Sequence, residues 1–388
     1  MDNTLRVIFA GGASGGHLMP GVATARALER AVPGCRTLFL TSESRTEKRC
    51  RGALAGFDTA WLPDNAWRGA AGRLLFPARS LWAAGRMVEI VRGFRPHVVL
   101  GLGSYNCAVP VLVARAFGVK TALLEANARP GAAVRLLAPF VDSVMVQWGE
   151  VIPRLKLRRA VVTGLPVREH LLSAERGAAL CRLGLRADRP TLLATGGSQG
   201  ALALNKTLYE ALRMTAARGV ELQVIHLTGI DHLQAALDER AGLGAGYRPF
   251  GFLGRMEDAY AAADFALART GGSTLAELTA LGLPSILVPH PYGSDHQRHN
   301  AELLGEVGAA MVIAQSELTA ERLCDALTAL ACDLALRRRM AERALHQGQP
   351  DAAARVAGEL AALAGFVPHM EQTTTRTEET PGRTSRAA

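Results

Sequence analysis

Short apolar segments alternate along this chain with longer stretches in which apolar residues recur at helical spacing. The predicted strands are residues 5–10, 98–101, 121–124 and 144–146 in the first half, and residues 191–195, 222–227, 265–268 and 285–288 in the second. Strands that alternate with helices are typical of right-handed βαβ units. The pattern therefore predicts an α/β protein with one parallel sheet in each half of the chain.

Both halves begin in the same way. Residues 5–10 run into the glycine-rich segment GGASGGH and a helical stretch over residues 20–31. Residues 191–195 likewise run into GGSQGA (residues 196–201) and a helical stretch from Leu202. A glycine-rich loop before a helix presents backbone N–H groups to an anion. We therefore expect two Rossmann-like domains that face each other across a cleft, with ligands at the carboxyl ends of the strands.

The domain boundary is predicted near the segment VVTGLPVRE, in which Gly164 and Pro166 interrupt the pattern. The expected N-terminal domain spans residues 1–163 and the expected C-terminal domain spans residues 164–366, whose last helix is a candidate to pack back on the N-terminal domain. Residues 367–388 are polar and have no apolar periodicity, so we expect a disordered tail.

Composition narrows the settings in which the protein is expected to work. Apolar residues make up 49% of the 388 residues, and the net charge is +9. No nucleic-acid-binding motif accompanies this charge, so nucleic acid is not an expected partner, whereas an anionic membrane surface or a diphosphate ligand fits it. Residues 1–12 lack a signal-peptide pattern, and the longest uncharged run, residues 96–114, is broken by glycine and proline. We therefore expect a cytoplasmic protein whose six scattered cysteines are reduced, buried thiols.

Candidate catalytic groups stand at the ends of predicted strands. In GGASGGH, the small residues Ser14, Gly15 and Gly16 allow the backbone to approach a substrate, and His17 opens the next helix. The same segment also fits a generic phosphate loop, in which His17 only caps or packs. Glu125 in the segment LLEAN ends a buried strand, where a carboxylate is costly unless it is hydrogen-bonded or functional.

A third glycine-rich segment begins at Arg269 with RTGGSTLAELTALGLP and predicts another anion site at the start of a helix. Glu277 lies one turn into this helix, where its carboxylate is placed to accept both hydroxyls of a ribose or simply to complement the helix dipole. Histidines and carboxylates gather near Gln297, but no two histidines stand four residues apart and no DxD sequence occurs. We therefore expect the site to work without a metal ion or another cofactor.

Together these motifs resemble those of the MurG family, glycosyltransferases of the GT-B type that use UDP-N-acetylglucosamine (UDP-GlcNAc) to complete lipid II. The resemblance runs from about residue 6 to residue 365. It implies that Arg168 in GLPVR contacts the diphosphate, that Ser198 in GGSQGA binds a phosphate, and that the backbone of Leu253 in FGFL contacts the uracil. The other substrate-binding residues that it implies are Ser14, Gly15, Gly16, Asn127, Gly272, Ser273, Thr274, Leu275, Ala276, Glu277 and Gln297.

The resemblance also implies the reaction. An inverting transferase moves N-acetylglucosamine (GlcNAc) from UDP-GlcNAc to the C4 hydroxyl of N-acetylmuramic acid (MurNAc) in lipid I, an undecaprenyl-diphosphate lipid, and so forms lipid II for peptidoglycan synthesis. The hydroxyl needs a general base within hydrogen-bond reach, for which His17 and Glu125 are the candidates.

Two departures from the family pattern concern the acceptor side. The family's His-Glu-Gln-Asn segment is Leu124, Glu125, Ala126 and Asn127 here, and its Gly-Gly-Tyr is GSY at residues 103–105. Three alternatives therefore stay open, namely a UDP-GlcNAc 2-epimerase, a transferase that makes a glycolipid from diacylglycerol, and a non-catalytic relative that only binds a UDP-sugar or a lipid.

A lipid acceptor implies contact with the cytoplasmic face of the inner membrane, so we expect a peripheral membrane protein. Residues 61–86 suit this contact because they mix apolar residues with arginines. The alternative is an ordinary helix with buried aromatics and solvated arginines. The residues concerned are Trp61, Trp67, Leu74, Leu75, Phe76, Trp82, Arg68, Arg73, Arg79 and Arg86.

Overall fold

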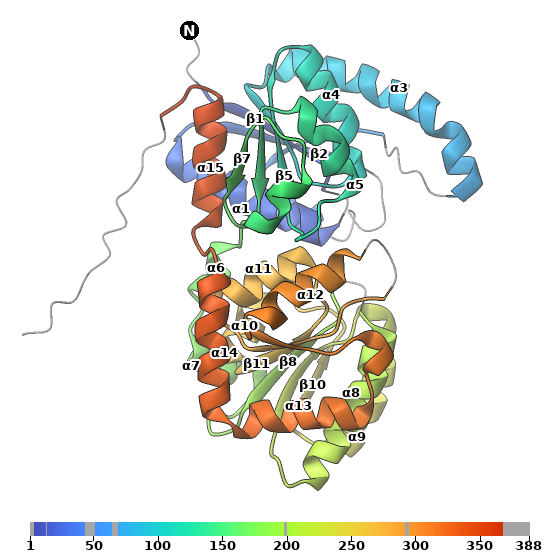
Figure 1. Cartoon of the computed structure of the whole chain (residues 1–388), viewed down its shortest axis with the longest axis vertical. Helices are drawn as coiled ribbons and strands as arrows, with labels where there is room; N and C mark the ends of the chain where they lie inside the picture. Colours follow the sequence, from blue (N-terminus) through green and yellow to red (C-terminus); the bar gives the residue numbers. More distant parts are fainter. Residues whose placement is uncertain are drawn as a thin grey trace, which may run out of the picture.

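The computed structural model describes residues 4–12, 14–42, 51–63, 69–197, 200–291 and 295–367. These residues form two parallel sheets, one above the other in Figure 1, each with its own set of helices. The predicted α/β class with one parallel sheet in each half is confirmed. The predicted tail beyond residue 367 lies outside the described residues, and so does Cys50.

Seven parallel strands form the N-terminal sheet, in the order β3-β2-β1-β4-β5-β6-β7. Their bounds are β1 Arg6–Ala10, β2 Arg36–Thr41, β3 Asp58–Trp61, β4 Val98–Gly101, β5 Lys120–Glu125, β6 Ser143–Val146 and β7 Ala160–Val162. The strand order reverses between β1 and β4, which pair with each other. At such a reversal the loops from the two strands diverge and leave room for a ligand at the carboxyl edge of the sheet.

Six parallel strands form the C-terminal sheet, in the order β10-β9-β8-β11-β12-β13. Their bounds are β8 Thr191–Thr195, β9 Gln223–Leu227, β10 Tyr247–Phe250, β11 Phe265–Ala268, β12 Ser285–Leu287 and β13 Ala310–Val312. Every residue of β8, β9, β11 and β12 is buried, as expected for strands that are covered by helices on both faces. The order reverses between β8 and β11, so this sheet repeats the arrangement of the first.

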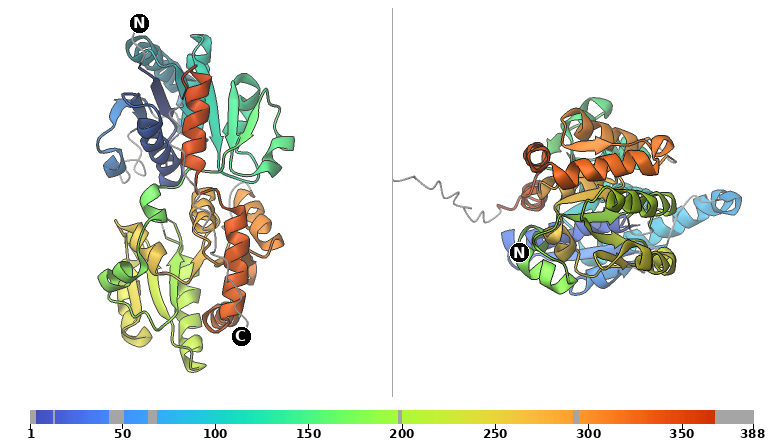
Figure 2. Two further views of the ribbon diagram at one scale, coloured as in Figure 1. Left: turned by 90° about the vertical axis from the view of Figure 1, so that its left-hand side faces the viewer. Right: turned by 90° about the horizontal axis from the view of Figure 1, so that it is seen from below.

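Helices cover both faces of each sheet (Figure 2). In the N-terminal half they are α1 Gly15–Ala31, α3 Gly69–Phe94, α4 Ala108–Ala116 and α5 Ala132–Leu137. In the C-terminal half they are α6 Glu169–Leu172, α7 Arg176–Leu183, α8 Leu202–Ala217, α9 Leu233–Leu243, α10 Met256–Ala262, α11 Gly272–Ala280, α12 His296–Glu306, α13 Ala320–Cys332 and α14 Leu334–Gln347. Helix α15 Ala352–Leu363 follows α14 in the sequence but packs on the N-terminal half. Within the described ranges, no helix is long and apolar enough to cross a membrane.

The strands that the apolar pattern predicts are all present, with ends that shift by at most a residue or two. Five strands were not predicted, and four of them, β3, β7, β10 and β13, are the edges of the two sheets. An edge strand is paired on one side only and is short, so its sequence carries no continuous apolar run. Helix α1 begins at Gly15 and not at residue 20 as predicted. Its first turn contains glycines, whose low helix propensity gives no helical signal in the sequence.

The chain passes between the domains twice, after β7 and after α14. The first passage contains Gly164, whose φ is +76°, and a Cβ built on it would lie 2.3 Å from Cβ of Gln349 in the second passage. The two passages therefore pack directly against each other. Helix α15, the last one, then packs along α1 of the N-terminal half, as Figure 1 shows.

The prediction that the cysteines are buried is wrong for Cys181 and Cys332. Cys107 and Cys324 are buried, but Cys181 and Cys332 are exposed on helices, and Cys35 is half-buried. All five are free thiols. Exposure follows from the helix face on which each residue falls, which the scattered spacing of cysteines does not specify.

A carboxylate anchors α15 to the N-terminal sheet. Glu359 accepts hydrogen bonds from Oγ of Ser143 (3.0 Å) and from Nη2 of Arg159 (3.0 Å), and Ser143 at the start of β6 is fully buried. The anchor holds in place the helix that links the C-terminal domain back to the N-terminal domain.

We predict that Glu359→Ala lowers the free energy of unfolding by about 1–3 kcal/mol, because it leaves the buried Ser143 hydroxyl without its acceptor. Urea-induced unfolding followed by circular dichroism measures the change. Arg355→Ala on the same helix is the control, because Arg355 pairs with Asp351 at the exposed surface, where ion pairs contribute about 0–1 kcal/mol. Equal effects of the two substitutions would contradict an anchoring role for Glu359.

Candidate active site

The first glycine-rich loop places a neutral histidine at the carboxyl end of β1. Ser14 stands immediately before α1, and its Oγ lies 2.8 Å from Nδ1 of His17, so the hydroxyl orients the imidazole. Burial lowers the pKa of His17 below the ordinary 6.5, which keeps the ring neutral at neutral pH. When Nδ1–H donates to Oγ of Ser14, Nε2 is the ring nitrogen that can take up a proton.

Glu125 ends β5 and organises the loop that follows it. Its Oε1 accepts hydrogen bonds from the backbone N–H and from Nδ2 of Asn127, both at 2.9 Å, and its Oε2 accepts one from the N–H of Gly131 at 2.7 Å. Burial raises the pKa of Glu125, and these three hydrogen bonds oppose that effect. Because Oε1 already accepts two hydrogen bonds and Oε2 accepts one, the predicted role of Glu125 as a base would fall to the remaining lone pair of Oε2.

The two domains meet where the start of α11 approaches the loop after β5. A Cβ built on Gly272, the first residue of α11, would lie 2.4 Å from the carbonyl oxygen of Ala126, so only glycine fits there. Gly16 in α1 likewise faces Ser273, with 3.8 Å between a Cβ built on Gly16 and Cβ of Ser273. The structure therefore brings the predicted residues of α1, β5 and α11 together at one boundary.

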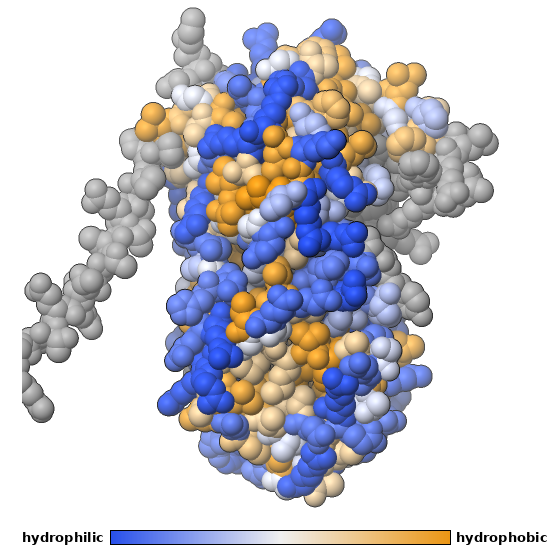
Figure 3. Space-filling view, viewed as in Figure 1, coloured by the Kyte–Doolittle hydropathy of each residue, from blue (hydrophilic) through white to orange (hydrophobic). Residues whose placement is uncertain are grey.

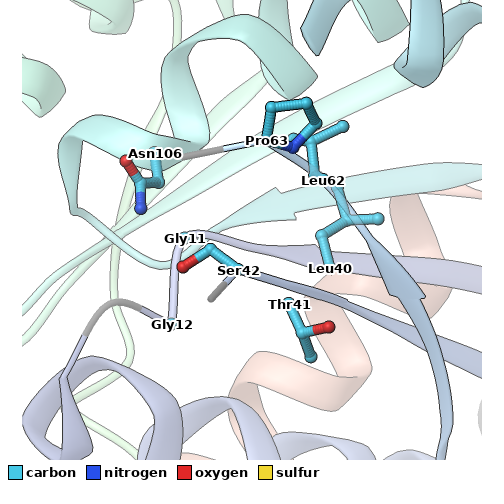
Figure 4. Close-up of a pocket in the computed structure, with 8 residues that line it drawn as sticks. All are labelled: Gly11, Gly12, Leu40, Thr41, Ser42, Leu62, Pro63 and Asn106. Carbon is cyan, nitrogen blue, oxygen red and sulfur yellow. The ribbon is translucent and has the colours of Figure 1, made fainter. Parts of the chain in front are cut away.

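A small recess opens beside the first loop, at the carboxyl ends of β1, β2 and β3. Figure 4 shows its lining, in which the side chains of Ser42 and Asn106 project from opposite sides. The lining residues are Gly11, Gly12, Leu40, Thr41, Ser42, Leu62, Pro63 and Asn106. The recess therefore shares the glycines that precede Ser14 and lies in the same domain as His17.

A larger pocket, of about 520 Å³, lies in the C-terminal domain. It is enclosed by the loops after β8, β11 and β12, at the same edge of the sheet. Its lining residues are Gly196, Gly197, Gly200, Ala201, Leu202, Ala203, Arg269, Gly271, Thr274, His290, Pro291, Gln297 and Gln315. The pocket therefore joins the second and third glycine-rich segments of the sequence, and a volume in this range suits a small organic ligand.

Arg269 is a buried cation in the lining of this pocket. Its side chain is held by the carbonyls of Val288 (3.0 Å) and Pro289 (3.3 Å) and by Oε1 of Gln315 (2.6 Å). Among the described residues no carboxylate pairs with Arg269, and its Nε has no hydrogen-bond partner. Burial lowers the pKa of Arg269, but an arginine stays charged. A buried positive charge without a counter-ion favours the binding of an anion.

Arg168 and Glu277 lie together, but neither is part of the pocket lining. Nη2 of Arg168 is 3.4 Å from Oε1 of Glu277, and the hydroxyl of Tyr260 donates to Oε2 of Glu277 at 2.6 Å. Burial raises the pKa of Glu277, and Arg168 and Tyr260 oppose this rise. The two predicted ligand contacts, to a diphosphate and to a ribose, would therefore compete with an existing ion pair.

The other predicted residues are distributed around the pocket. Thr274 and Gln297 line it, and Oε1 of Gln297 accepts a hydrogen bond from the N–H of His290 at 3.0 Å. The side chains of Leu275 and Ala276 are buried in the core, so these residues offer a ligand only their backbone. Ser198 lies outside the described residues. Leu253 is half-buried against the core in the loop after β10.

Some residues of the site were not assigned a role from the sequence. Arg269 follows directly after the fully buried strand β11, and an arginine at that position is itself a signal of an anion site. Gln315 carries no such signal, because its contact with Arg269 comes from a distant part of the chain. Arg269 and Asn300 lie in the C-terminal region that resembles the family, but the resemblance assigned neither of them a role. Within the described ranges, no group of three or more His, Cys, Asp or Glu side chains is arranged to hold a metal ion.

We predict that inorganic pyrophosphate binds in this pocket and that Arg269→Met weakens the binding at least tenfold, because a charged hydrogen bond contributes about 1.5–3 kcal/mol. Isothermal titration calorimetry at fixed ionic strength measures the affinity. Arg322→Met removes the same charge from an exposed pair with Glu317 on α13 and should leave the affinity unchanged. Equal losses in the two variants would reveal only an effect of net charge, and an unaltered affinity in Arg269→Met would refute the anion site.

Comparison with known proteins covers both halves of this chain. The models of the glycosyltransferase family 28 N-terminal and C-terminal domains match residues 7–146 and 191–356. The chain is 35% identical over 360 residues to the UDP-N-acetylglucosamine–N-acetylmuramyl-(pentapeptide) pyrophosphoryl-undecaprenol N-acetylglucosamine transferase of Desulforamulus reducens, with 90% of this chain and 96% of that protein covered. The transferase of the same name from Sorangium cellulosum is 38% identical over 367 residues, with 92% and 88% covered.

The crystal structure of MurG from Acinetobacter baumannii has the same fold. It superposes with a TM-score of 0.72 and 26% sequence identity, over 92% of this chain and 99% of that one. The chain therefore belongs to glycosyltransferase family 28 and, within it, to the MurG family of GT-B enzymes.

Proposed function

We propose that this protein transfers GlcNAc from UDP-GlcNAc to the C4 hydroxyl of MurNAc in lipid I and so forms lipid II. The observation that carries the proposal is the arrangement of two different sites at one domain boundary. A neutral, oriented His17 lies on the N-terminal side, and a pocket with the buried cation Arg269 lies on the C-terminal side. Transfer to a hydroxyl requires a base and a stabilised anionic leaving group, and the two sides supply one each.

The pocket of the C-terminal domain is proposed to hold the donor. Its loop after β8 and the start of α11 present backbone N–H groups, which suit the diphosphate together with Arg269. Thr274 and Gln297 in the lining are placed to contact the GlcNAc ring. Ser198 stays a predicted phosphate ligand of the same loop.

Binding of the nucleoside end of the donor is proposed to separate Arg168 from Glu277. In that state the carboxylate of Glu277 accepts the ribose hydroxyls, with Tyr260 holding its other oxygen, and Arg168 turns toward the diphosphate. In this exchange Arg168 trades a carboxylate for the diphosphate, and Glu277 trades the guanidinium for hydroxyl donors, so both charged groups keep hydrogen-bonding partners. The backbone of Leu253 stays the predicted contact of the uracil.

The acceptor is proposed to enter from the side of the recess beside Gly12. Nε2 of His17 takes the proton of the C4 hydroxyl while the hydroxyl oxygen forms a bond to C1 of GlcNAc. The bond between C1 and the diphosphate oxygen breaks on the opposite face, so configuration at C1 inverts and UDP leaves with the electron pair. Arg269 and the N-terminus of α11 stabilise the charge that builds on the diphosphate, and Asn127 helps to hold the acceptor.

We predict that His17→Asn lowers kcat for transfer by about 10²- to 10⁴-fold while the affinity for UDP stays within threefold, because only the base is removed. The assay follows radiolabelled GlcNAc from UDP-GlcNAc into lipid I in detergent micelles containing a metal chelator. For the unaltered protein, kcat/KM should stay constant from pH 8 to pH 7 and fall only below pH 6.5. The lowered pKa of His17 sets this sign, because activity needs the neutral ring and is lost as the pH falls through that pKa.

Ser14→Ala is the companion variant in this assay. It leaves the imidazole in place but removes the hydroxyl 2.8 Å from Nδ1, so a smaller loss of kcat than in His17→Asn is expected. Full activity of His17→Asn would assign the base to another group, of which Glu125 is the first candidate. UDP-GlcNAc binding without any transfer would exclude lipid I as acceptor, and epimerised UDP-sugar or labelled diacylglycerol would identify the rival enzymes.

We further propose that the N-terminal domain binds the cytoplasmic face of the membrane through α3 and the end of β3. Leu81 and Trp82 on α3 are 77% and 59% exposed, and the ring of Trp82 packs against that of Trp61 at 5.2 Å. Arg79 and Arg86 stand on the same helix, which suits an anionic lipid surface. Figure 3 shows apolar surface on the N-terminal half, in the region where Figure 1 places α3, α4 and α5.

Several residues predicted for this membrane contact are not located. Trp67 and Arg68, and the side chains of Arg73, Leu74 and Leu75, lie outside the described part of the structure. The proposal therefore rests on the exposed residues of the described part of α3 and on Trp61.

We predict that the double substitution Leu81→Ser and Trp82→Ser weakens binding to vesicles of phosphatidylglycerol and phosphatidylethanolamine at least tenfold, because burying a large apolar side chain contributes about 1.5–3 kcal/mol. Vesicle sedimentation measures the bound fraction. Leu334→Ser changes a residue of the C-terminal domain that is 50% exposed and should have no effect. Unchanged binding of the double variant would move the membrane contact to another surface.

A further inference from the structure

A buried asparagine of the C-terminal domain bonds directly to the acceptor-side loop of the other domain. Asn300 on α12 is fully buried. Its Oδ1 accepts a hydrogen bond from the N–H of Ala128 at 2.8 Å, and its Nδ2 donates to Oδ1 of Asn127 at 3.1 Å. Both partners belong to the loop that Glu125 organises, so this one side chain joins that loop to the opposite domain.

The polarity of these hydrogen bonds is consistent along the whole chain of partners. Nδ2 of Asn127 donates to Glu125, which turns Oδ1 of Asn127 toward Asn300. The second N–H of the Asn300 amide donates to the carbonyl of Thr270 at 3.0 Å. Both hydrogens of the amide and its oxygen are therefore engaged, and no other side chain of similar size offers two donors and one acceptor in this geometry.

The other end of the chain of hydrogen bonds reaches the pocket. Thr270 follows β11, and its Oγ1 donates to the carbonyl of Gln297 at 2.6 Å, while its N–H donates to Oε1 of Gln297 at 3.3 Å. Gln297 lines the pocket next to His290. An unbroken series of hydrogen bonds thus runs from the carboxylate of Glu125 in one domain to the pocket lining of the other.

We propose that Asn300 is a positioning residue that couples occupation of the donor pocket to the arrangement of the acceptor-side loop. The inference rests on the proposed function. Donor sugar bound against Gln297 steadies Thr270, Thr270 steadies Asn300, and Asn300 holds Asn127 and Ala128 in place for the acceptor. Asn300 has none of its hydrogen-bonding groups turned toward the pocket in this arrangement, so it acts through its neighbours and not on the reacting atoms.

The test compares donor binding with transfer in Asn300→Ala. The affinity for UDP, measured by calorimetry, should change less than threefold, because the donor contacts lie in the C-terminal domain. The value of kcat should fall at least 30-fold and KM for lipid I should rise, because the loop around Asn127 loses its support. The test requires that the unaltered protein transfers GlcNAc to lipid I. A lack of transfer by the unaltered protein would contradict the proposed function and not the role of Asn300.

Gln223→Ala is the matched control for general destabilisation. Gln223 is also a buried amide with saturated hydrogen bonds, since it accepts from the N–H of Arg186 and donates to the carbonyl of the same residue, both at 2.8 Å. Gln223 lies at the start of β9, whereas the pocket lies at the carboxyl ends of the strands. The hydrogen bonds of Gln223 stay within one domain. Gln223→Ala should lower the melting temperature as much as Asn300→Ala does and leave kcat unchanged. Equal losses of kcat in both would overturn the proposal.

The substitution Asn300→Asp should make activity depend on pH in a way that a purely structural role of Asn300 would not. Aspartate keeps the acceptor for Ala128 but turns an oxygen toward the oxygens of Asn127 and Thr270. Protonation restores one donor, so the activity of Asn300→Asp divided by that of the unaltered protein should rise at least threefold from pH 8 to pH 6. The other titratable and charged groups nearby, Glu125, Arg129, His296 and His299, are the same in both proteins, so the ratio compares the two side chains in the same surroundings. A ratio that stays flat, or falls toward pH 6, would contradict the inference.

A double-substitution cycle closes the test. If Asn300 acts through Asn127, the variant that carries both Asn300→Ala and Asn127→Ala should be no more than threefold slower than the slower single variant. If the losses of kcat in the two single variants multiply in the double variant, the two residues act independently and the proposed coupling is overturned.

Discussion

The close approach of Gly272 to Ala126 is the constraint on which the rest of the structure depends. At this point the first residue of α11 and the loop after β5 pass with no room for a side chain. With its amide oriented to donate, Gln147 reaches the carbonyls of both residues, at 3.2 Å to Gly272 and 2.7 Å to Ala126. Because a helix N-terminus lies at the boundary itself, its partial positive charge acts on groups from both domains. The proposed function needs this proximity, since it assigns donor and acceptor to different sheets.

Buried charge around this contact explains why the site is preorganised. Arg269, Glu125 and Glu277 are all buried, and each charge would be costly without hydrogen bonds. Glu125 is stabilised by its own loop and Glu277 by Arg168 and Tyr260, whereas Arg269 has only neutral oxygen acceptors. The remaining unbalanced charge is therefore positive and faces the pocket. That polarity matches a diphosphate leaving group, which gains negative charge as transfer proceeds.

Apart from β2, the sequence predicts the buried strands at the centre of each sheet and misses the edge strands. Central strands such as residues 191–195 and 265–268 are continuous apolar runs, because both faces are covered, while β3, β7, β10 and β13 lack that signal. The same logic holds for the site. A polar residue directly after a buried strand, such as Glu125, stands out in the sequence.

Pairings between side chains could not be predicted in this way. The contacts of Arg168 with Glu277 and of Asn127 with Asn300 join residues 109 and 173 positions apart. The first contact depends on how α11 packs within the C-terminal domain and the second on how the two domains are set against each other, and periodicity within one element encodes neither arrangement. The roles of these residues from the family resemblance therefore stay proposals, while their placement at the domain boundary follows from the fold.

The departures from the family pattern at Leu124 and Ala126 alter packing and leave the polar geometry intact. Leu124 is 2% exposed and belongs to the apolar core, so the residue that replaces the family's histidine packs among apolar side chains. Ala126 stands against Gly272, where its small side chain permits the close approach of the domains. Neither residue supplies a side-chain hydrogen bond to Glu125, Asn127 or Asn300, whose partners are all present. The hydrogen bonds from Glu125 to the pocket lining are therefore intact beside these substitutions, which give no structural support to the non-catalytic alternative.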